Sequence, residues 1–141
     1  MELIGHKSAA LLDLWSLCHF FVGVAIGNFV FRGSNDGIND GKNSSGRKKN
    51  EFFTLFIILA LAYAWELLEF RLEAGDGGEY IAYWLQGREY WLNRLLSDPF
   101  LVLIGSMFSR RFQLLIWPAR VILVAWIWLF AFIFPHSMAY L

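Results

Sequence analysis

Residues 52–70 read FFTLFIILALAYAWELLEF, an apolar run interrupted by Thr54, Glu66 and Glu69. A helix needs about 20 mostly apolar residues to cross the hydrocarbon core of a bilayer, which is about 30 Å thick. The run therefore predicts a membrane-spanning helix over residues 52–71. Its two glutamates lie near one end. A charged side chain in a bilayer costs about 2.5–3.5 kcal/mol on insertion scales, so it indicates a functional site by default.

Three further apolar segments predict spans over residues 9–31, 92–109 and 115–135. Residues 121–134 are apolar throughout, but they make only about 21 Å of helix at 1.5 Å per residue, so the last span has to extend beyond them. The N-terminus has mixed charges and no signal-peptide cleavage pattern, so we expect the first span to be retained. The predicted fold class is an all-α membrane protein, with one domain (residues 1–141) of four transmembrane helices.

Two segments between these spans have a different composition. Residues 79–96 contain several Tyr and Trp residues, which favour the membrane surface, and predict an interfacial amphipathic helix before the third span. Asp98 and Pro99 then fit the N-cap and the first position of a new helix, so we expect a break there. Residues 32–50 are rich in Gly, Asn, Ser and Lys, and predict a mobile polar loop.

The overall composition agrees with a membrane protein. The chain is 57% hydrophobic and 17% charged, with a mean hydropathy of +0.47, whereas soluble domains are about 45–50% apolar and 25% charged. The formal net charge is zero, so no nucleic-acid partner is expected. The single cysteine, Cys18, excludes an intramolecular disulfide. Gly23 and Gly27 lie one turn apart, which predicts close packing against another helix.

The distribution of Lys and Arg predicts the orientation. With four spans, one side carries eight of these residues and the other side four. The first set is Arg32, Lys42, Arg47, Lys48, Lys49, Arg110, Arg111 and Arg120, and the second is Lys7, Arg71, Arg88 and Arg94. Short cytoplasmic loops carry the excess of positive charge. We therefore expect a multi-pass protein of the plasma (inner) membrane, with the N-terminus and C-terminus both extracytoplasmic.

Polar residues of three predicted spans fall at one membrane face, whichever way the protein is oriented. In an up-down-up arrangement, the start of the first span, the end of the second and the start of the third lie on the same side. The candidate catalytic residues found there are His19, Glu66, Glu69 and Asp98, with Asn93 and Arg94 in support. We expect His19 and Glu66 within hydrogen-bonding or one-water distance, and Asp98 or Arg94 as the next neighbour.

Several chemistries fit these residues. His19, Glu66 and Glu69 are suitable ligands for a divalent metal with one open position. Without a metal, a His–carboxylate pair suits proton transfer, and His19 alone could be an axial ligand to a tetrapyrrole. Structural roles are equally open. His19 and Glu66 would then form an interhelical hydrogen bond, Glu69 would be solvated among lipid head groups, and Asp98 would be an N-cap.

Three stretches of the sequence resemble a known family. They are DLWSLCHFFVG at 13–23, WELLEF at 65–70 and GREYWLNRLLSDPFLVLIG at 87–105. Together they resemble small VanZ-like bacterial membrane proteins, over roughly residues 13–109. The matching positions are His19, Glu66, Glu69, Asn93 and Asp98. That group is associated with glycopeptide resistance and has no established reaction, so the resemblance implies a cell-envelope setting.

These observations predict a polytopic envelope protein with a polar site at the outer leaflet. It would be a hydrolase or transferase acting on a lipid-linked or cell-envelope substrate. The alternative is a non-enzymatic small subunit of a larger membrane complex, with a structural or cofactor-binding role. The expected partners are the lipid bilayer and either such a substrate or other membrane subunits.

Overall fold

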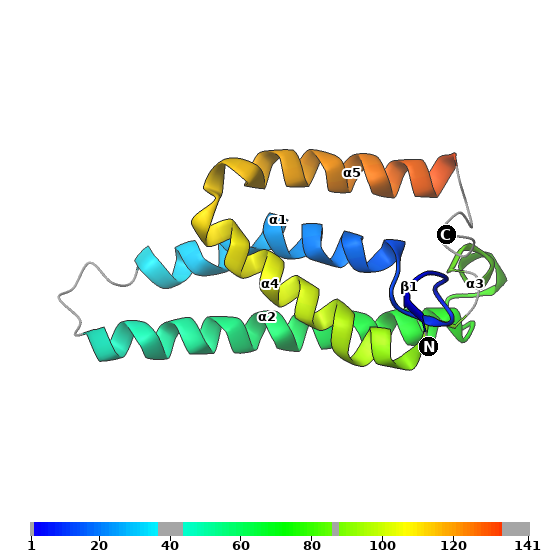
Figure 1. Cartoon of the computed structure of the whole chain (residues 1–141), viewed down its shortest axis with the longest axis horizontal. Coiled ribbons are helices and arrows are strands. Elements are labelled where there is room, and N and C mark those ends of the chain that lie inside the picture. The colour runs from blue at the N-terminus through cyan, green and yellow to red at the C-terminus, as the bar shows by residue number, and fades with distance from the viewer. Residues whose placement is uncertain (1, 37–43, 86–87, 134–141) are drawn as a thin grey trace.

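The computed structural model describes residues 2–36, 44–85 and 88–133, and most of these are helical. In Figure 1, α1, α2 and α5 run along the length of the molecule, and α4 runs obliquely across α1 toward α2. The α-helices are α1 (Leu14–Asp36), α2 (Ser44–Glu73), α3 (Glu79–Leu85), α4 (Asp98–Arg111) and α5 (Ile116–Phe132). Of these, α1 packs most extensively against α4, and α5 packs mainly against α1.

The first helix begins later than residue 9, where the sequence predicted its start. Residues Ala10–Leu12 form strand β2, which pairs in parallel with β1 (Glu2–Ile4). Helix α1 then begins at Leu14. Asp13 caps it, because its Oδ1 accepts a hydrogen bond of 2.8 Å from the backbone N–H of Ser16. The prediction was wrong here because apolar character alone does not show where a helix is capped.

The predicted loop over residues 32–50 is also partly wrong. Helix α1 continues to Asp36 and α2 already begins at Ser44, while residues 37–43 lie outside the described part of the chain. Once an apolar run has nucleated a helix, each added residue costs little, so the helix propagates into a polar sequence. The polar composition of residues 32–36 and 44–50 is therefore compatible with helix.

The interfacial helix predicted over 79–96 is much shorter in the structure. Helix α3 covers only Glu79–Leu85, and residues 88–90 are not helical. The expected break at Asp98 and Pro99 is absent, because the π-helix η1 (Asn93–Ser97) runs directly into α4 and Asp98 has helical dihedral angles. Asp98 is therefore not an N-cap.

The π-helix accommodates a proline that an α-helix would not. Within a helix, Pro99 lacks an N–H and its ring crowds the carbonyl of residue 95. A π-turn widens the backbone at such a position. The carbonyl of Leu95 is instead satisfied by the hydroxyl of Tyr63, which donates a hydrogen bond of 2.8 Å. The sequence predicted an interruption of the helix at Asp98 and Pro99. The structure has a widened π-helical turn just before them, and the helical backbone continues without a break.

Glycines bring α1 and α4 into backbone contact. A Cβ added to Gly23 would clash with the carbonyl of Val102, and one added to Gly105 would clash with the carbonyl of Phe20. A Cβ on Gly27 would lie 2.7 Å from the backbone of Ser106. The close packing predicted from Gly23 and Gly27 is confirmed.

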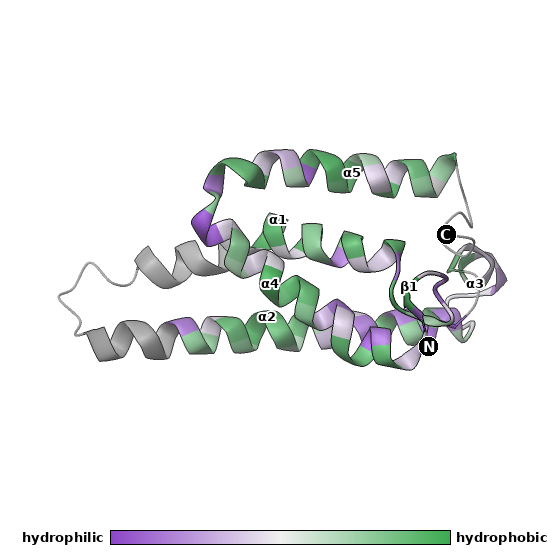
Figure 2. Cartoon of the chain, viewed as in Figure 1, coloured by the Kyte–Doolittle hydropathy of each residue, from purple (hydrophilic) through white to green (hydrophobic). Residues whose placement is uncertain are grey.

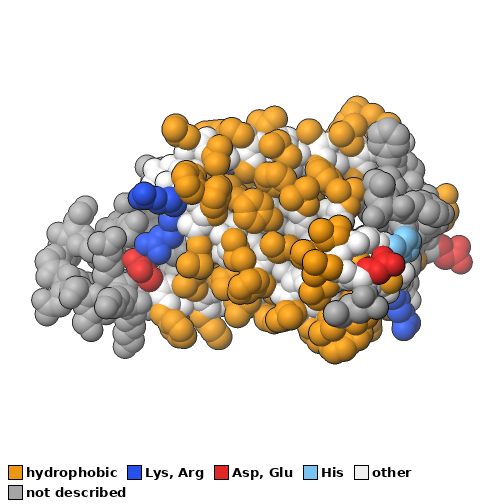
Figure 3. Space-filling view, in the orientation of Figure 1, with side chains coloured by type: hydrophobic (Ala, Val, Ile, Leu, Met, Phe, Trp, Pro, Cys, Tyr) orange, Lys and Arg blue, Asp and Glu red, His pale blue; other side chains and the backbone are white. Residues whose placement is uncertain are grey.

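Within the described residues, two helices are long and apolar enough to cross a membrane. Their apolar stretches are Glu51–Glu73 in α2 and Gln113–Phe130, and the second includes the 3₁₀ turn η2 (Gln113–Leu115) and most of α5. A shorter apolar stretch, Leu14–Gly27, lies in α1. Hydrophobic residues line the middle of the helices in Figure 2. On the face in Figure 3, charged side chains lie toward the two ends, with a broad hydrophobic surface between them. The structure thus bears out a mostly helical fold, but it supports two candidate spans among the described residues where the sequence predicted four.

Candidate functional site

Charged side chains gather where the start of α1, the end of α2 and the segment leading into α4 meet. We call this group the charged cluster. It consists of Lys7, His19, Glu66, Glu69, Glu73, Glu89, Arg94 and Asp98, and all of these side chains are buried. Burying a charge is costly unless it is paired, so the arrangement within this cluster is expected to matter.

His19 lies between two carboxylates, one from each neighbouring helix. Its Nε2 is 3.0 Å from Oε1 of Glu66, and its Nδ1 is 3.1 Å from Oδ2 of Asp98. Nδ1 also lies 3.0 Å from the carbonyl oxygen of Trp15, one turn earlier in α1. The predicted proximity of His19, Glu66 and Asp98 is confirmed. A histidine held by two carboxylates can accept and return a proton while keeping a fixed orientation.

Glu69 belongs to the same cluster and is not solvated. Its side chain is only 1% exposed, its Oε2 accepts a hydrogen bond of 2.9 Å from the indole N–H of Trp15, and its Oε1 is 3.6 Å from Nζ of Lys7. The interpretation of Glu69 as a solvated residue among head groups is therefore wrong.

Two permanent cations lie on one side of the cluster, and both contact Glu73. Nζ of Lys7 is 2.6 Å from one oxygen of Glu73, and Nη2 of Arg94 is 2.6 Å from the other. Arg94 also lies 3.2 Å from Oε2 of Glu89 and, through Nε, 3.7 Å from Oε2 of Glu66. Arg94 therefore supports the site as predicted, but its main partner is a glutamate that the sequence analysis did not select.

Asn93 connects the cluster to the start of α1. Its side-chain N–H donates a hydrogen bond of 2.8 Å to Glu89, and its Oδ1 accepts one of 3.0 Å from the hydroxyl of Ser16. The asparagine is fully buried. Its predicted supporting place beside the site is confirmed, and the contacts indicate that it positions Glu89.

Three members of the cluster were missed, and two of them left a signal in the sequence. Glu73 follows Glu69 by four residues, which places both on one helix face. Glu89 precedes Asn93 by four residues in the same way. Lys7 left none, because it lies in the irregular N-terminal segment. One backbone and one side-chain hydrogen bond hold that segment: the Lys7 carbonyl accepts a hydrogen bond from the N–H of Tyr90, and Lys7 Nζ donates to the Leu85 carbonyl.

Burial and neighbouring charges shift the ionisation of the groups outside the predicted spans. Burial acts to lower the pKa of Lys7, but the carboxylates of Glu69 and Glu73 outweigh it, and the net pKa is raised above its ordinary value. Burial, together with the negative charges of Asp98 and Glu69, raises the pKa of Glu89. Lys7 therefore stays charged, and Glu89 favours either a proton or another cation.

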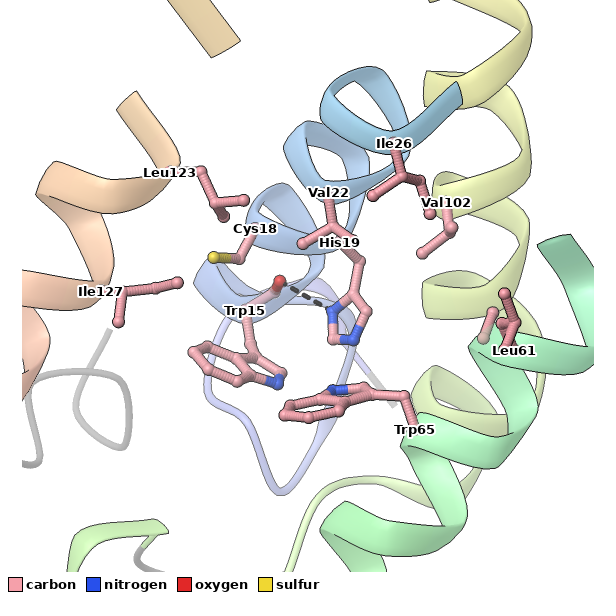
Figure 4. Close-up of a pocket in the computed structure, with 11 residues that line it drawn as sticks. Trp15, Cys18, His19, Val22, Ile26, Leu61, Trp65, Val102, Leu123 and Ile127 are labelled. Carbon is pink, nitrogen blue, oxygen red and sulfur yellow. Dashed lines mark hydrogen bonds between the residues drawn. The ribbon is translucent and has the colours of Figure 1, made fainter. Parts of the chain in front are cut away.

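An apolar cavity of about 330 Å³ lies on the other side of His19. Its walls come from α1, α2, α4 and α5, and Figure 4 shows the His19 ring among apolar side chains with the indoles of Trp15 and Trp65 close by. The lining residues are Trp15, Cys18, His19, Val22, Ile26, Leu61, Ala62, Trp65, Val102, Leu123 and Ile127. Among the described residues, His19 alone belongs to both the cavity and the charged cluster.

Three groups of side chains within the described residues could hold a metal ion. They are His19, Glu66 and Glu69; Glu66, Glu89 and Asp98; and Glu69, Glu73 and Glu89. In each group the ligand atoms lie within 4.8 Å of one another. The first is the ligand set that the sequence predicted. Axial ligation of a tetrapyrrole by His19 would require displacing a carboxylate, since both ring nitrogens already have one within 3.1 Å.

Comparison of the chain with models of protein families, with curated proteins and with solved structures gave no match.

Proposed function

We propose that this protein is an integral membrane protein whose α1, α2, η1–α4 and α5 each cross the bilayer. The support is the exposure of its apolar helices. Only 22% of the apolar window of α2 and 11% of that of α5 is buried inside the protein, whereas the core helix of a soluble protein would be mostly buried. Phe52, Leu67, Val124 and Phe132 are each more than 60% exposed. Apolar surface of this extent calls for lipid or a partner.

The proposed orientation places the charged cluster at the extracytoplasmic face of the plasma membrane. The eight-to-four distribution of Lys and Arg supports it, because the richer side is expected to be cytoplasmic. The resemblance to VanZ-like proteins agrees with an envelope setting. In this orientation a substrate would approach from the outer leaflet.

We propose further that the protein is a hydrolase or transferase acting on a lipid-linked or cell-envelope substrate. The observation that carries this proposal is the position of His19, which forms part of the wall between the apolar cavity and the charged cluster. Pockets for small ligands are typically about 300–1,000 Å³, mostly apolar, and have few polar groups. The hydrocarbon chain of a lipid would occupy the cavity and its head group would lie at the cluster.

The chemistry would be proton transfer by His19 together with Glu66 and Asp98. In hydrolysis, a water oxygen would bond to the electrophilic atom of the head group while its proton passes to the His19–Glu66 pair. The bond to the leaving oxygen would break, and that oxygen would take the proton back. In transfer, the hydroxyl of an acceptor would replace the water. Such acid–base help contributes about 10²–10⁴-fold to a rate.

A second candidate is a structural subunit of a membrane complex. It is favoured by the ion pairs of Lys7 and Arg94, which join the N-terminal segment, α2 and the segment before α4 at 2.6 Å contacts with Glu73. In that case the cluster would stabilise the bundle, and the exposed surfaces of α2 and α5 would bind other subunits.

Lipid binding separates the two candidates. The experiment is native mass spectrometry of the full chain, purified in detergent and offered a polyprenyl phosphate and a diacyl phospholipid. We expect one retained lipid per chain. The variant Leu123→Trp, which places a large ring in the cavity, should retain at least about tenfold less. Leu129→Trp on the exposed part of α5 is the matched control and should bind as the wild type does. Equal retention by both variants would contradict the proposed use of the cavity.

A further inference from the structure

The charges of the buried cluster do not balance. Five carboxylates (Glu66, Glu69, Glu73, Glu89 and Asp98) lie with two permanent cations, Lys7 and Arg94. Even a doubly protonated His19 leaves two of the carboxylates without a cation. An unpaired buried charge is too costly to persist, so the cluster must take up protons or bind another cation.

The carboxylates that lack a permanent cation lie in one part of the cluster. Glu73 has both cations at 2.6 Å, and Glu69 has the Trp15 indole and Lys7. On the other side, Glu66 and Asp98 share His19, at 3.0 and 3.1 Å, and Arg94 lies no nearer than 3.7 Å to Glu66. Both residues are at least 98% buried, and Oδ1 of Asp98 has no hydrogen-bond partner among the described residues. A buried carboxylate oxygen without a partner indicates a missing ligand.

These two carboxylates converge with a third. Glu66, Glu89 and Asp98 each bring one oxygen within 4.8 Å of the others. They come from the end of α2, from the segment before η1 and from the first position of α4. Their positive neighbours are His19, at 3.0 and 3.1 Å from Glu66 and Asp98, and Arg94, at 3.2 Å from Glu89 and 3.7 Å from Glu66.

We propose that Glu66, Glu89 and Asp98 bind one divalent cation of the hard type, such as Mg²⁺, Mn²⁺ or Ca²⁺. Three carboxylate oxygens suit hard cations, which prefer oxygen ligands. One ion of charge +2 balances the two carboxylates that lack a cation. The remaining positions of a six-coordinate ion are filled by water or by oxygen atoms of a substrate.

The other two ligand groups fit such an ion less well. In the group of Glu69, Glu73 and Glu89, both oxygens of Glu73 already contact a cation, Lys7 or Arg94, at 2.6 Å. In the group of His19, Glu66 and Glu69, one oxygen of Glu69 is held by Trp15. With the ion bound as proposed, His19 becomes its neighbour, and orients Glu66 and Asp98 as an outer-shell residue does at other metal sites.

Manganese binding tests this site without any substrate. The proposed ion would be a cofactor of the proposed enzyme, so this inference rests on the proposed function. A chain without enzymatic activity could still bind the ion, so the metal site and the enzymatic function can be disproved separately. The full chain, purified in detergent and stripped with a chelator, is titrated with Mn²⁺ while electron paramagnetic resonance measures the free ion. We expect one Mn²⁺ per chain, and at least about tenfold weaker binding by Glu89→Gln.

Two further variants control for the position of the ion. Glu79→Gln changes an exposed residue of α3 and should bind Mn²⁺ as the wild type does. Glu69→Gln removes a member of both other ligand groups and should change the dissociation constant by less than about threefold. A wild type that binds no Mn²⁺, or a Glu69→Gln effect as large as that of Glu89→Gln, would overturn the proposal. The wild-type titration decides even if a variant fails to fold.

Discussion

Charged side chains lie at both ends of the helices, and the two ends differ in burial. At one end, Arg110 of α4 pairs with Glu51 of α2 at 2.9 Å, and their side chains are 34% and 32% exposed. At the other end, Arg94 contacts Glu73 at 2.6 Å, with side chains 10% and 1% exposed. Solvent screens the first pair, which is worth about 0–1 kcal/mol. The second has no such screening, so each missing partner there carries a large cost.

This difference separates ordinary charged helix ends from a candidate site. Charges at the Arg110 end are compatible with any helix end that meets water. Charges at the Arg94 end are enclosed by α1, α2 and α4, and the carboxylates among them outnumber the cations. Only an arrangement maintained for binding or chemistry, or for holding the bundle together, explains such a group. The predictions below test the difference between the two ends.

Reporter fusions give the largest expected effect, because in the proposed orientation the two ends of the helix bundle lie on opposite sides of the membrane. A reporter enzyme fused after Leu141 should be active only in the extracytoplasmic space, and one inserted near Ser44 only in the cytoplasm. The expectation follows from the excess of Lys and Arg near Ser44. The reverse pattern would place the charged cluster at the cytoplasmic face and contradict the outer-leaflet substrate.

Removing one arginine from each end should have very different consequences for stability. Arg94→Met leaves the buried carboxylate of Glu89 without its cation and Glu73 with Lys7 alone, and should cost about 3–5 kcal/mol. Arg110→Met removes an exposed partner of Glu51 and should cost less than about 1 kcal/mol. Equilibrium unfolding of both variants in the same detergent measures the two values. Equal losses would mean that the enclosure of the Arg94 end has no energetic consequence.

The smallest effect concerns the π-helix that presents Arg94. Tyr63→Phe leaves the Leu95 carbonyl, freed by Pro99, without its 2.8 Å hydrogen bond, and should cost about 0.5–1.5 kcal/mol. Tyr80→Phe is the matched control, since Tyr80 is 74% exposed on α3. Unfolding measurements that rank the control at or above Tyr63→Phe would show that the hydrogen bond does not support η1.

Much of the site could be predicted because an up-down order of long helices restricts which residues lie at the same level. Once α1, α2 and α4 are assigned, connectivity alone puts His19, Glu66, Glu69 and Asp98 at one level. Depth does not fix rotation about the helix axes, so the proximity of His19 to Glu66 and to Asp98 or Arg94 was predicted from what a functional site requires. The structure confirms that they face one another, whereas their chemical roles stay a prediction.

The parts that were missed depend on local geometry that hydropathy does not encode. The start of α1 is set by Asp13 and the strand pair before it. The continuity of η1 with α4 depends on Tyr63, more than thirty residues away from Leu95. Lys7 enters the cluster because backbone contacts fold the N-terminal segment over the helix ends. The contacts of Tyr63 and Lys7 are tertiary, and the cap at Asp13 is local, but residue periodicity predicts none of them.

Turnover of a lipid in proteoliposomes tests the central claim, that the buried cluster is a reaction site. Purified protein would be reconstituted with a polyprenyl-linked head group and a phospholipid mixture, and the released water-soluble head group quantified by mass spectrometry. We predict release by the wild type and by Glu51→Gln at similar rates, and at least about 100-fold slower release by Glu66→Gln with unchanged insertion. Absence of release by the wild type, equal release by Glu66→Gln, or failure of that variant to insert would contradict the claim.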